Sequence, residues 1–177
     1  MRIAIGNCFV ECVQSDVDNQ VDVDALFYYL PEPAEEWDDP RQVLTRTLHP
    51  GQAFIEDLPG GSGRHIIHAM GPGLVDDNLS AEIVRCCLAN AIALCEQYEV
   101  RSVALPLTEG MTGKIPVPLV AEIAAKVIAD HALQPRHLRV VRFALASALE
   151  LNTLPRYLIK AAAALADHEA RTMKSGG

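Results

Sequence analysis

The sequence predicts a single α/β domain built around a mixed, largely parallel β-sheet. From residue 65 onward, three apolar runs typical of strands alternate with three segments of helical periodicity, the pattern of βαβ units. Before residue 65, strand-like segments follow one another with few helices between them, which favours some antiparallel pairing. The 177 residues, 50% of them apolar, suit one domain with a substantial core. We therefore expect one domain over residues 1–177, with a loose tail at about 172–177.

The first half of the chain is predicted to contribute four strands. Residues 2–13 are rich in β-branched and apolar side chains around Gly6, which indicates a strand with a break. Residues 15–24 are polar and acidic and suit a turn or a sheet edge. The nearly continuous apolar run at 23–30 ends at Pro31 and is typical of a strand buried on both faces. Two short strands are expected at 52–58 and 65–70, and a proline-rich, acidic loop at 31–40.

The second half is predicted to add three helices and two more strands. Ser80 suits a helix N-cap, with Glu82 in the first turn, and apolar residues then recur at helical spacing to residue 98. A strand at 101–107 leads into a loop with two glycines at 108–113. Pro118 fits the first turn of the next helix. The last strand is expected at 138–145 and a closing helix at 155–171.

The negative net charge of the chain bears on the kinds of partner that it can bind. A formal net charge of −8 argues against a broad electrostatic surface for nucleic-acid backbones. It is compatible with a small anionic ligand, because a loop of backbone N–H groups binds phosphate without any Lys or Arg. No apolar run approaches membrane-spanning length, and no signal-peptide pattern opens the sequence, so no membrane partner is expected.

The five cysteines form an odd set without a regular disulfide framework, which indicates reduced thiols and a cytoplasmic location. Cys8 and Cys12 have no matching Cys/His pair at suitable spacing, so neither a metal site nor a cofactor is expected. Cys87 and Cys95 recur on one predicted helical face and are interpreted as small core residues.

Three segments, in chain order, share the pattern of one known family. P-G-Q-A-F-I at 50–55 with L-P at 58–59 is similar to T-G-E-A-x-x-T…L-P, and H-I-I-H-A-M-G-P at 65–72 is similar to a strand ending in I-H-A-V-G-P. S-V-A-L-P-L-T-E-G-M-T-G-K-I-P at 102–116 is similar to S-I-A-F-P-x-I-S-T-G-x-x-G-x-P. Together these segments, over roughly 50–145, resemble the macro domain family. The resemblance implies a three-layer α/β/α fold and binding of ADP-ribose or a related nucleotide.

The third segment also has a physical interpretation of its own. A strand runs into a glycine-containing loop and then into a helix, so backbone N–H groups and the helix start both favour an anion there. In macro domains the matching loop surrounds the diphosphate and the distal ribose. An ordinary βα connection with turn residues is the alternative. The positions that carry over as ligand-binding candidates are Thr108, Glu109, Gly110, Met111, Thr112 and Gly113.

Other parts of the chain depart from the family pattern. The family's G-D-I segment, whose acid recognises the adenine amino group, is matched here by Gly6-Asn7-Cys8, which makes Asn7 a candidate through its carbonyl oxygen. The family's V-N-A-A-N run is matched by residues 24–31, which contain neither asparagine. In hydrolytic members those asparagines hold the distal ribose and help to position the attacking water. The family's second glycine-rich loop is replaced by the acidic segment 31–40, so the chain is interpreted as a divergent member.

Several residues near the expected site have two interpretations. Tyr28 and Tyr29 suit stacking on a base or ribose, or burial at the end of a strand, and with Gly71 they are possible pocket residues. His68 is interpreted as a core histidine. The only tryptophan, Trp37, either covers a pocket or packs on the domain, and the acids around it are interpreted as a solvated loop.

Three functions are therefore considered. The leading hypothesis is binding of ADP-ribose or a related nucleotide diphosphate through the Gly/Thr loop, without catalysis. The second is an ADP-ribosyl hydrolase with non-standard catalytic residues, for which the sequence identifies none. The third is a degenerate macro fold that acts as a protein-interaction scaffold, whose partner the sequence does not indicate.

Overall fold

The computed structural model describes residues 1–30, 48–60, 62–73, 77–109, 111 and 115–175. The elements in chain order are β1 (Arg2–Ile5), β2 (Cys8–Val13), the 3₁₀ turn η1 (Val17–Asn19), β3 (Ala25–Leu30), β4 (Ala53–Asp57), β5 (His65–Met70), α2 (Asp77–Gln97), β6 (Ser102–Pro106), α3 (Val117–Ala132), β7 (Val140–Ala144) and α4 (Ala148–Ser175). No helix among these residues is long and apolar enough to cross a membrane.

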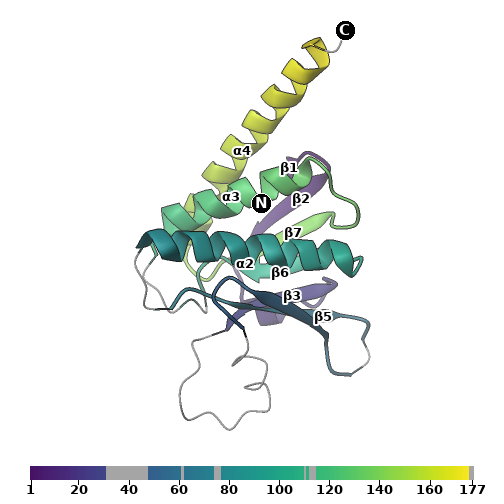
Figure 1. Cartoon of the computed structure of the whole chain (residues 1–177), viewed down its shortest axis with the longest axis vertical. Coiled ribbons are helices and arrows are strands. Elements are labelled where there is room, and N and C mark those ends of the chain that lie inside the picture. The colour runs from purple at the N-terminus through teal and green to yellow at the C-terminus, as the bar shows by residue number, and fades with distance from the viewer. Residues whose placement is uncertain (31–47, 61, 74–76, 110, 112–114, 176–177) are drawn as a thin grey trace.

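The seven strands form one mixed sheet in the order β1-β2-β7-β6-β3-β5-β4 (Figure 1). The five inner strands are parallel to one another, and the two edge strands, β1 and β4, are antiparallel to their neighbours. The expected mixed, largely parallel sheet is therefore confirmed. The carboxyl ends of β2, β7, β6, β3 and β5 all lie at one edge, which is where such sheets bind ligands.

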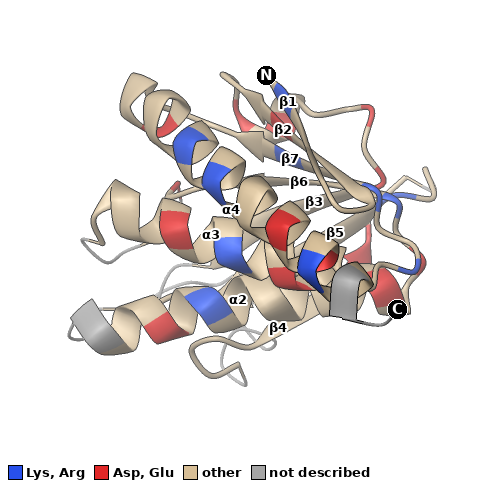
Figure 2. Ribbon diagram, turned by 90° about the horizontal axis from the view of Figure 1, so that it is seen from above, with Lys and Arg blue, Asp and Glu red and all other residues tan. Residues whose placement is uncertain are grey.

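The sheet lies between a layer of helices on one face and a shorter segment on the other. Helices α2, α3 and α4 lie side by side along one face of the sheet (Figure 2). On the opposite face, Val17 and Val23 pack against Leu26, Ala104 and Ala144. These three strand residues alternate with residues that face the helices. Among the described residues, the three layers are thus the helices, the sheet and the segment that contains η1.

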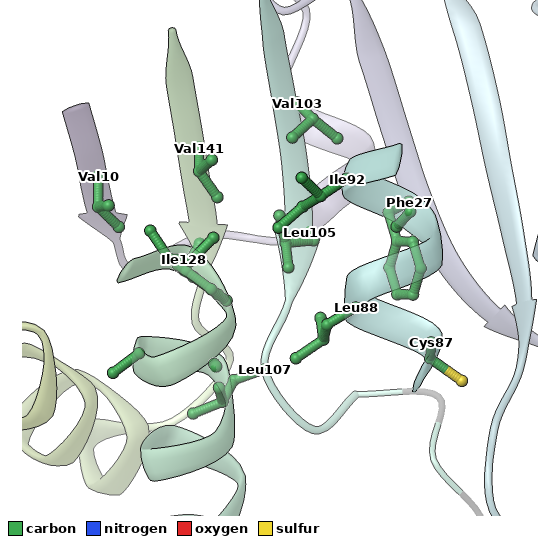
Figure 3. Packing of buried hydrophobic residues seen from close by; sticks show 14 of the residues in the cluster. Val10, Phe27, Cys87, Leu88, Ile92, Val103, Leu105, Leu107, Ile128 and Val141 are labelled. Carbon is green, nitrogen blue, oxygen red and sulfur yellow. The ribbon is translucent and has the colours of Figure 1, made fainter. Parts of the chain in front are cut away.

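Apolar side chains fill the space between the sheet and the helical layer (Figure 3). Phe27 and Phe143 are fully buried there, against Leu88, Ile92 and Ile128 of the helices. Cys87 and Cys95 are also fully buried, as expected of small core residues, and burial raises the pKa of each thiol to about 12. These thiols are therefore inert components of the core.

The closing helix begins earlier than the sequence analysis expected. Helix α4 starts at Ala148 rather than at 155, continues through Pro155, and extends to Ser175, beyond the expected end at 171. Its first turn is fixed by a capping box: the Glu150 N–H donates to Ser147 Oγ at 3.2 Å, and the Ser147 N–H donates to Glu150 Oε2 at 3.1 Å. The S-x-x-E signal for this start is present in the sequence. Helix α2 likewise begins at Asp77, so Ser80 is a buried helical residue rather than the N-cap.

A partly buried contact between a histidine and a carboxylate joins the ends of α2 and α3 and makes stability depend on pH. His131 Nε2 lies 3.2 Å from Glu96 Oε1, and the Glu96 carboxylate also accepts the N–H groups of residues 136–138. Burial lowers the pKa of His131 below its usual 6.5, although the Glu96 charge opposes the shift. The unfolded chain therefore binds a proton at His131 more readily than the folded chain does. The contribution of neutral His131 to the free energy of unfolding is complete above pH 6.5 and is lost as the pH falls through the folded-state pKa.

We expect the free energy of unfolding to decrease between pH 7 and pH 5, and the decrease to be smaller in His131→Gln. Urea unfolding of both proteins at several pH values measures this difference. Equal slopes in the two proteins would show that His131 does not contribute.

Candidate functional site

A pocket of about 240 Å³ opens at the carboxyl edge of the sheet. Its lining comes from three of the parallel strands and the segments that follow them. Asp16, Val17 and Asp18 follow β2, Tyr28 and Tyr29 lie near the end of β3, and Pro106 and Glu109 end or follow β6. Open α/β sheets bind ligands beyond the carboxyl ends of their strands, so this pocket is the candidate functional site.

The structure corrects the match to the family's G-D-I segment. Asn7 lies in the hairpin turn between β1 and β2, before Cys8, and therefore at the opposite edge of the sheet from the pocket. The segment that follows the first parallel strand is Ser15-Asp16-Val17. Its Asp16 side chain is exposed at the pocket. Asp16, which the sequence analysis did not single out, therefore lies at the pocket, and Asn7 does not.

Tyr28 contributes a polar group to the pocket wall. Its hydroxyl donates a hydrogen bond to Asp18 Oδ1 at 2.5 Å. Burial, together with this hydrogen bond, raises the pKa of Tyr28 above its usual value. The side chain is therefore a neutral phenol, held in place by the carboxylate of the 3₁₀ turn. Of the two interpretations of Tyr28, the structure favours the pocket wall.

Tyr29 and Gly71 belong mainly to the core beneath the pocket. Tyr29 is 5% exposed and packs edge-on against Phe27, with ring centroids 4.8 Å apart. A Cβ atom added at Gly71 would lie 3.4 Å from Tyr29 Cδ1, so Gly71 lies directly beside the Tyr29 ring. The Tyr29 hydroxyl is buried with no hydrogen-bond partner among the described residues.

The first residue of the expected phosphate loop already has partners within the chain. The N–H of Thr108 donates to Glu150 Oε1 at 3.2 Å, and the Thr108 hydroxyl donates to the same oxygen. Glu150 is 2% exposed, so a buried carboxylate of α4 holds the end of β6. Both donors of Thr108 are therefore used inside the protein, and the side chain positions the loop rather than offering itself to an anion.

The rest of that loop is described only in part. Glu109 is exposed and lines the pocket. Met111 is half-buried, and its N–H donates to the Thr108 carbonyl oxygen at 3.1 Å, which closes a turn. Gly110, Thr112 and Gly113 lie outside the described residues, as does the acidic segment 31–40 with Trp37.

His68 lies on the sheet beside the pocket, and its burial agrees with the sequence analysis. The residue is 6% exposed, and its ring stacks on Phe54 with centroids 4.9 Å apart. Its Nε2 atom lies 2.8 Å from Glu56 Oε1. The tilted Tyr28 ring is 6.3 Å away, so His68 supports the pocket wall from the neighbouring strand.

The charges around the pocket restrict what it can bind directly. Asp16, Asp18 and Glu109 place three carboxylates on its lining, beside the two phenols. Carboxylates accept hydrogen bonds from amino and hydroxyl groups, whereas at short range they repel phosphate. The pocket is therefore suited to the base or sugar portion of a ligand rather than to its anionic portion.

The fold is an α/β domain with a mixed β-sheet and a pocket at the carboxyl ends of its parallel strands. The sequence model of the family described as "Macro domain" matches residues 31–124, which is more than half of the chain. The chain therefore belongs to the macro domain family. A "macro domain-containing protein" of Ralstonia nicotianae is 36% identical over 96 residues, a match that covers 49% of this chain and 53% of the relative. The chain thus spans about half the length of the curated relative that it matches.

Solved macrodomains share the fold at low sequence identity. A structure of the Oceanobacillus iheyensis macrodomain with ADP has a TM-score of 0.73 and 19% identity, covering 90% of this chain and 95% of the other. A mutant of the same macrodomain with ADPR has a TM-score of 0.72 and 19% identity, covering 90% and 97%. The Trypanosoma brucei macrodomain in complex with ADP-ribose has a TM-score of 0.64 and 15% identity, covering 83% and 68%. These similarities confirm the macro-domain fold.

Proposed function

We propose that this protein binds ADP-ribose or a related nucleotide diphosphate at the pocket on the carboxyl edge of its sheet. The observation that carries the proposal is the place of Asp16, which follows the first parallel strand and lines the pocket, as the acid of the family's G-D-I segment would. Solved relatives with the same fold are described as complexes with ADP, ADPR or ADP-ribose, which supports the same ligand class.

The proposed binding mode assigns different ligand groups to different parts of the edge. The Asp16 carboxylate accepts a hydrogen bond from the adenine amino group, as the resemblance to the family implies. The carboxylates beside it keep the diphosphate away from this part of the pocket. The diphosphate then lies toward the glycine-containing segment 108–113, whose donors are backbone N–H groups other than those of Thr108 and Met111, which already have acceptors within the chain.

Isothermal titration calorimetry with ADP-ribose, with ADP and AMP as reference ligands, tests the proposal. We expect saturable binding of ADP-ribose, and an affinity at least about tenfold lower in Asp16→Ala, because a hydrogen bond to a charged group contributes roughly 1.5–3 kcal/mol. Asn7→Ala is the matched control, since Asn7 lies at the opposite edge of the sheet and its loss leaves the affinity unchanged.

Two outcomes would count against this assignment. Equal loss of affinity in Asn7→Ala and Asp16→Ala would show that the ligand does not bind at this pocket. No heat with any of the three nucleotides at millimolar concentration, from a protein that is folded by circular dichroism, would overturn nucleotide binding. That second result would leave the protein-interaction scaffold as the function to test.

We also propose a cytoplasmic location, supported by the state of the cysteines. All five are free thiols, and four of them are buried. Exported proteins commonly use their cysteines in disulfides, whereas the cytoplasm keeps thiols reduced. Fractionation of the native host, with immunodetection of the protein, tests this location.

A further inference from the structure

Gln20, at the end of the 3₁₀ turn η1, is one of the few polar residues buried in the domain. It is 7% exposed and is not part of the pocket lining, whereas Asp16, Val17 and Asp18 of the same segment line the pocket. Burial of a polar side chain costs free energy unless its donors and acceptors are paired. The partners of Gln20 therefore indicate what the buried amide does.

The side chain of Gln20 links the pocket segment to a strand of the sheet. Its Nε2 donates to the carbonyl oxygen of Asp16 at 3.1 Å, and its Oε1 accepts from Arg142 Nη1 at 3.2 Å. A carbonyl oxygen only accepts and a guanidinium only donates, so these two partners fix the orientation of the amide. An amide offers a donor and an acceptor on one planar group, which a carboxylate or a thioether of similar size does not. Gln20 thus connects residue 16 to β7 in a way that Glu and Met cannot.

The Arg142 end of this link is itself fixed by two acids. Arg142 Nε donates to Glu11 Oε2 at 2.8 Å, and Arg142 Nη2 donates to Asp22 Oδ2 at 3.1 Å. The Arg142 side chain is 15% exposed, and hydrogen bonds between charged groups are among the strong ones. Glu11 lies on β2, directly opposite Arg142 of β7 in the sheet register. The link therefore starts from a fixed point of the sheet.

The Gln20 amide is the closest side-chain or backbone donor to the Asp16 carbonyl oxygen. The N–H of Asn19 lies 3.3 Å from this oxygen, and the hydroxyl of Ser15 lies 3.4 Å from it. On its other side, the carbonyl oxygen of Gln20 accepts from Arg64 Nη2 at 2.6 Å. The position of the backbone at residue 16 therefore depends on Gln20, which arginines hold from two directions.

The direction of the Asp16 carboxylate depends in turn on that backbone. Asp16 precedes η1 with an extended backbone, and its side chain makes no capping hydrogen bond to the turn. The carboxylate is therefore exposed at the pocket without being fixed by its own turn. Side chains that recognise a ligand need supporting hydrogen bonds that hold them in the productive geometry. For Asp16 that support comes through its main chain.

We infer that Gln20, held by Arg142, is a positioning residue that aims Asp16 at the base of the ligand and so sets the preference for a base with an amino group. The inference rests on the proposed function, in which the Asp16 carboxylate accepts a hydrogen bond from the adenine amino group. Gln20 touches no part of the ligand and acts through Asp16 alone. Its loss therefore reduces recognition of the amino group and leaves the other contacts of the ligand in place.

Isothermal titration calorimetry with two ligands tests the inference. ADP carries the amino group, and purine riboside 5′-diphosphate lacks it. We expect the wild-type protein to bind ADP at least about tenfold more tightly than the analogue, because the amino group donates to a charged acceptor. In Gln20→Glu this ratio of affinities is expected to fall about threefold to tenfold, the effect of one hydrogen bond, since a carboxylate has no donor for the Asp16 carbonyl oxygen.

Asn19→Asp is the matched control for the added charge. It makes the same change from amide to carboxylate at an exposed neighbouring residue whose side chain takes no part in the link. The new charge repels the diphosphate of both ligands alike, so the ratio of the two affinities is expected to stay at the wild-type value. Gln20→Glu keeps an acceptor for Arg142, and circular dichroism confirms that both variants are folded.

Arg142→Lys tests the other end of the link. Lysine keeps the charge but not the planar fork that reaches Gln20, Glu11 and Asp22 together. We expect the substitution to lower the same ratio of affinities in the wild-type background. In the Gln20→Met background, where residue 20 has neither donor nor acceptor, it is expected to have no further effect on the ratio. Additive effects of the two substitutions would overturn the link between Arg142 and Asp16.

The failure of this inference is distinguishable from the failure of the proposed function. A folded Gln20→Glu protein with the wild-type ratio of affinities would overturn the positioning role, and so would an equal loss of affinity for both ligands. In either case the wild-type protein would still bind ADP, and the proposed function would stand. A wild-type protein that binds neither ligand would overturn the proposed function, and the positioning role with it.

Discussion

Glu150→Ala is expected to lower the free energy of unfolding by about 2–4 kcal/mol, because it leaves three part-buried donors without their acceptor. Glu150 is 2% exposed and accepts the N–H and hydroxyl of Thr108 as well as the N–H of Ser147. The substitution also removes half of the capping box that fixes the start of α4. The loss of these contacts separates the end of β6 from the loop that follows β7.

Urea unfolding followed by circular dichroism measures this effect, with Glu169→Ala as the matched control. Glu169 is exposed on the same helix, so its replacement is expected to change stability by less than about 0.5 kcal/mol. Glu150→Gln keeps an acceptor oxygen at the same position and is expected to fall between the two. A Glu150→Ala protein as stable as the Glu169→Ala protein would show that these hydrogen bonds do not hold the loop.

Most strands and helices were predictable because their signals are local. The run at 25–30 is apolar on both faces because β3 is a central strand, and glycine marks the break between β1 and β2. The predicted helix starts were less accurate, because more than one residue near each start is a plausible N-cap. Pro155 suggests one start for α4, and the S-x-x-E pattern of Ser147 and Glu150 indicates the earlier start that the structure has. A proline in the early turns of a helix does not by itself decide where the helix begins.

The candidate site was harder to predict because it depends on which strand starts the parallel sheet. Gly6-Asn7-Cys8 and Ser15-Asp16-Val17 both follow an apolar run, and only the sheet topology separates them. Strand β1 runs antiparallel to β2, so the turn between them lies at the amino-terminal end of β2. The pocket lies at the carboxyl ends of the parallel strands, on the opposite side of the sheet. Similarly, nothing in the sequence indicates that Glu150, 42 residues away, takes both donors of Thr108. Such contacts are set by tertiary packing and not by local pattern.

Gly6→Ala is expected to destabilise the protein by about 2–4 kcal/mol, from backbone strain and steric conflict acting together. Gly6 has φ of +52° in the β1–β2 turn, a left-handed conformation that residues with a Cβ atom adopt at a cost. The added Cβ would lie 2.6 Å from the carbonyl oxygen of Ala132 at the end of α3. That neighbour is backbone and not a flexible side chain, so either the hairpin or the end of the helix has to move.

A second glycine separates the two causes. Gly63 also has positive φ, at +70°, but a Cβ atom there would meet nothing within 4 Å. Gly63→Ala therefore carries the backbone strain alone, about 1–2 kcal/mol, and thermal and urea unfolding of the two variants should differ by the cost of the contact with Ala132. Equal destabilisation of the two variants would mean that α3 shifts to accommodate the new side chain without a further loss of stability. A larger effect in Gly6→Ala would show that the hairpin turn between β1 and β2 is fixed against the end of α3.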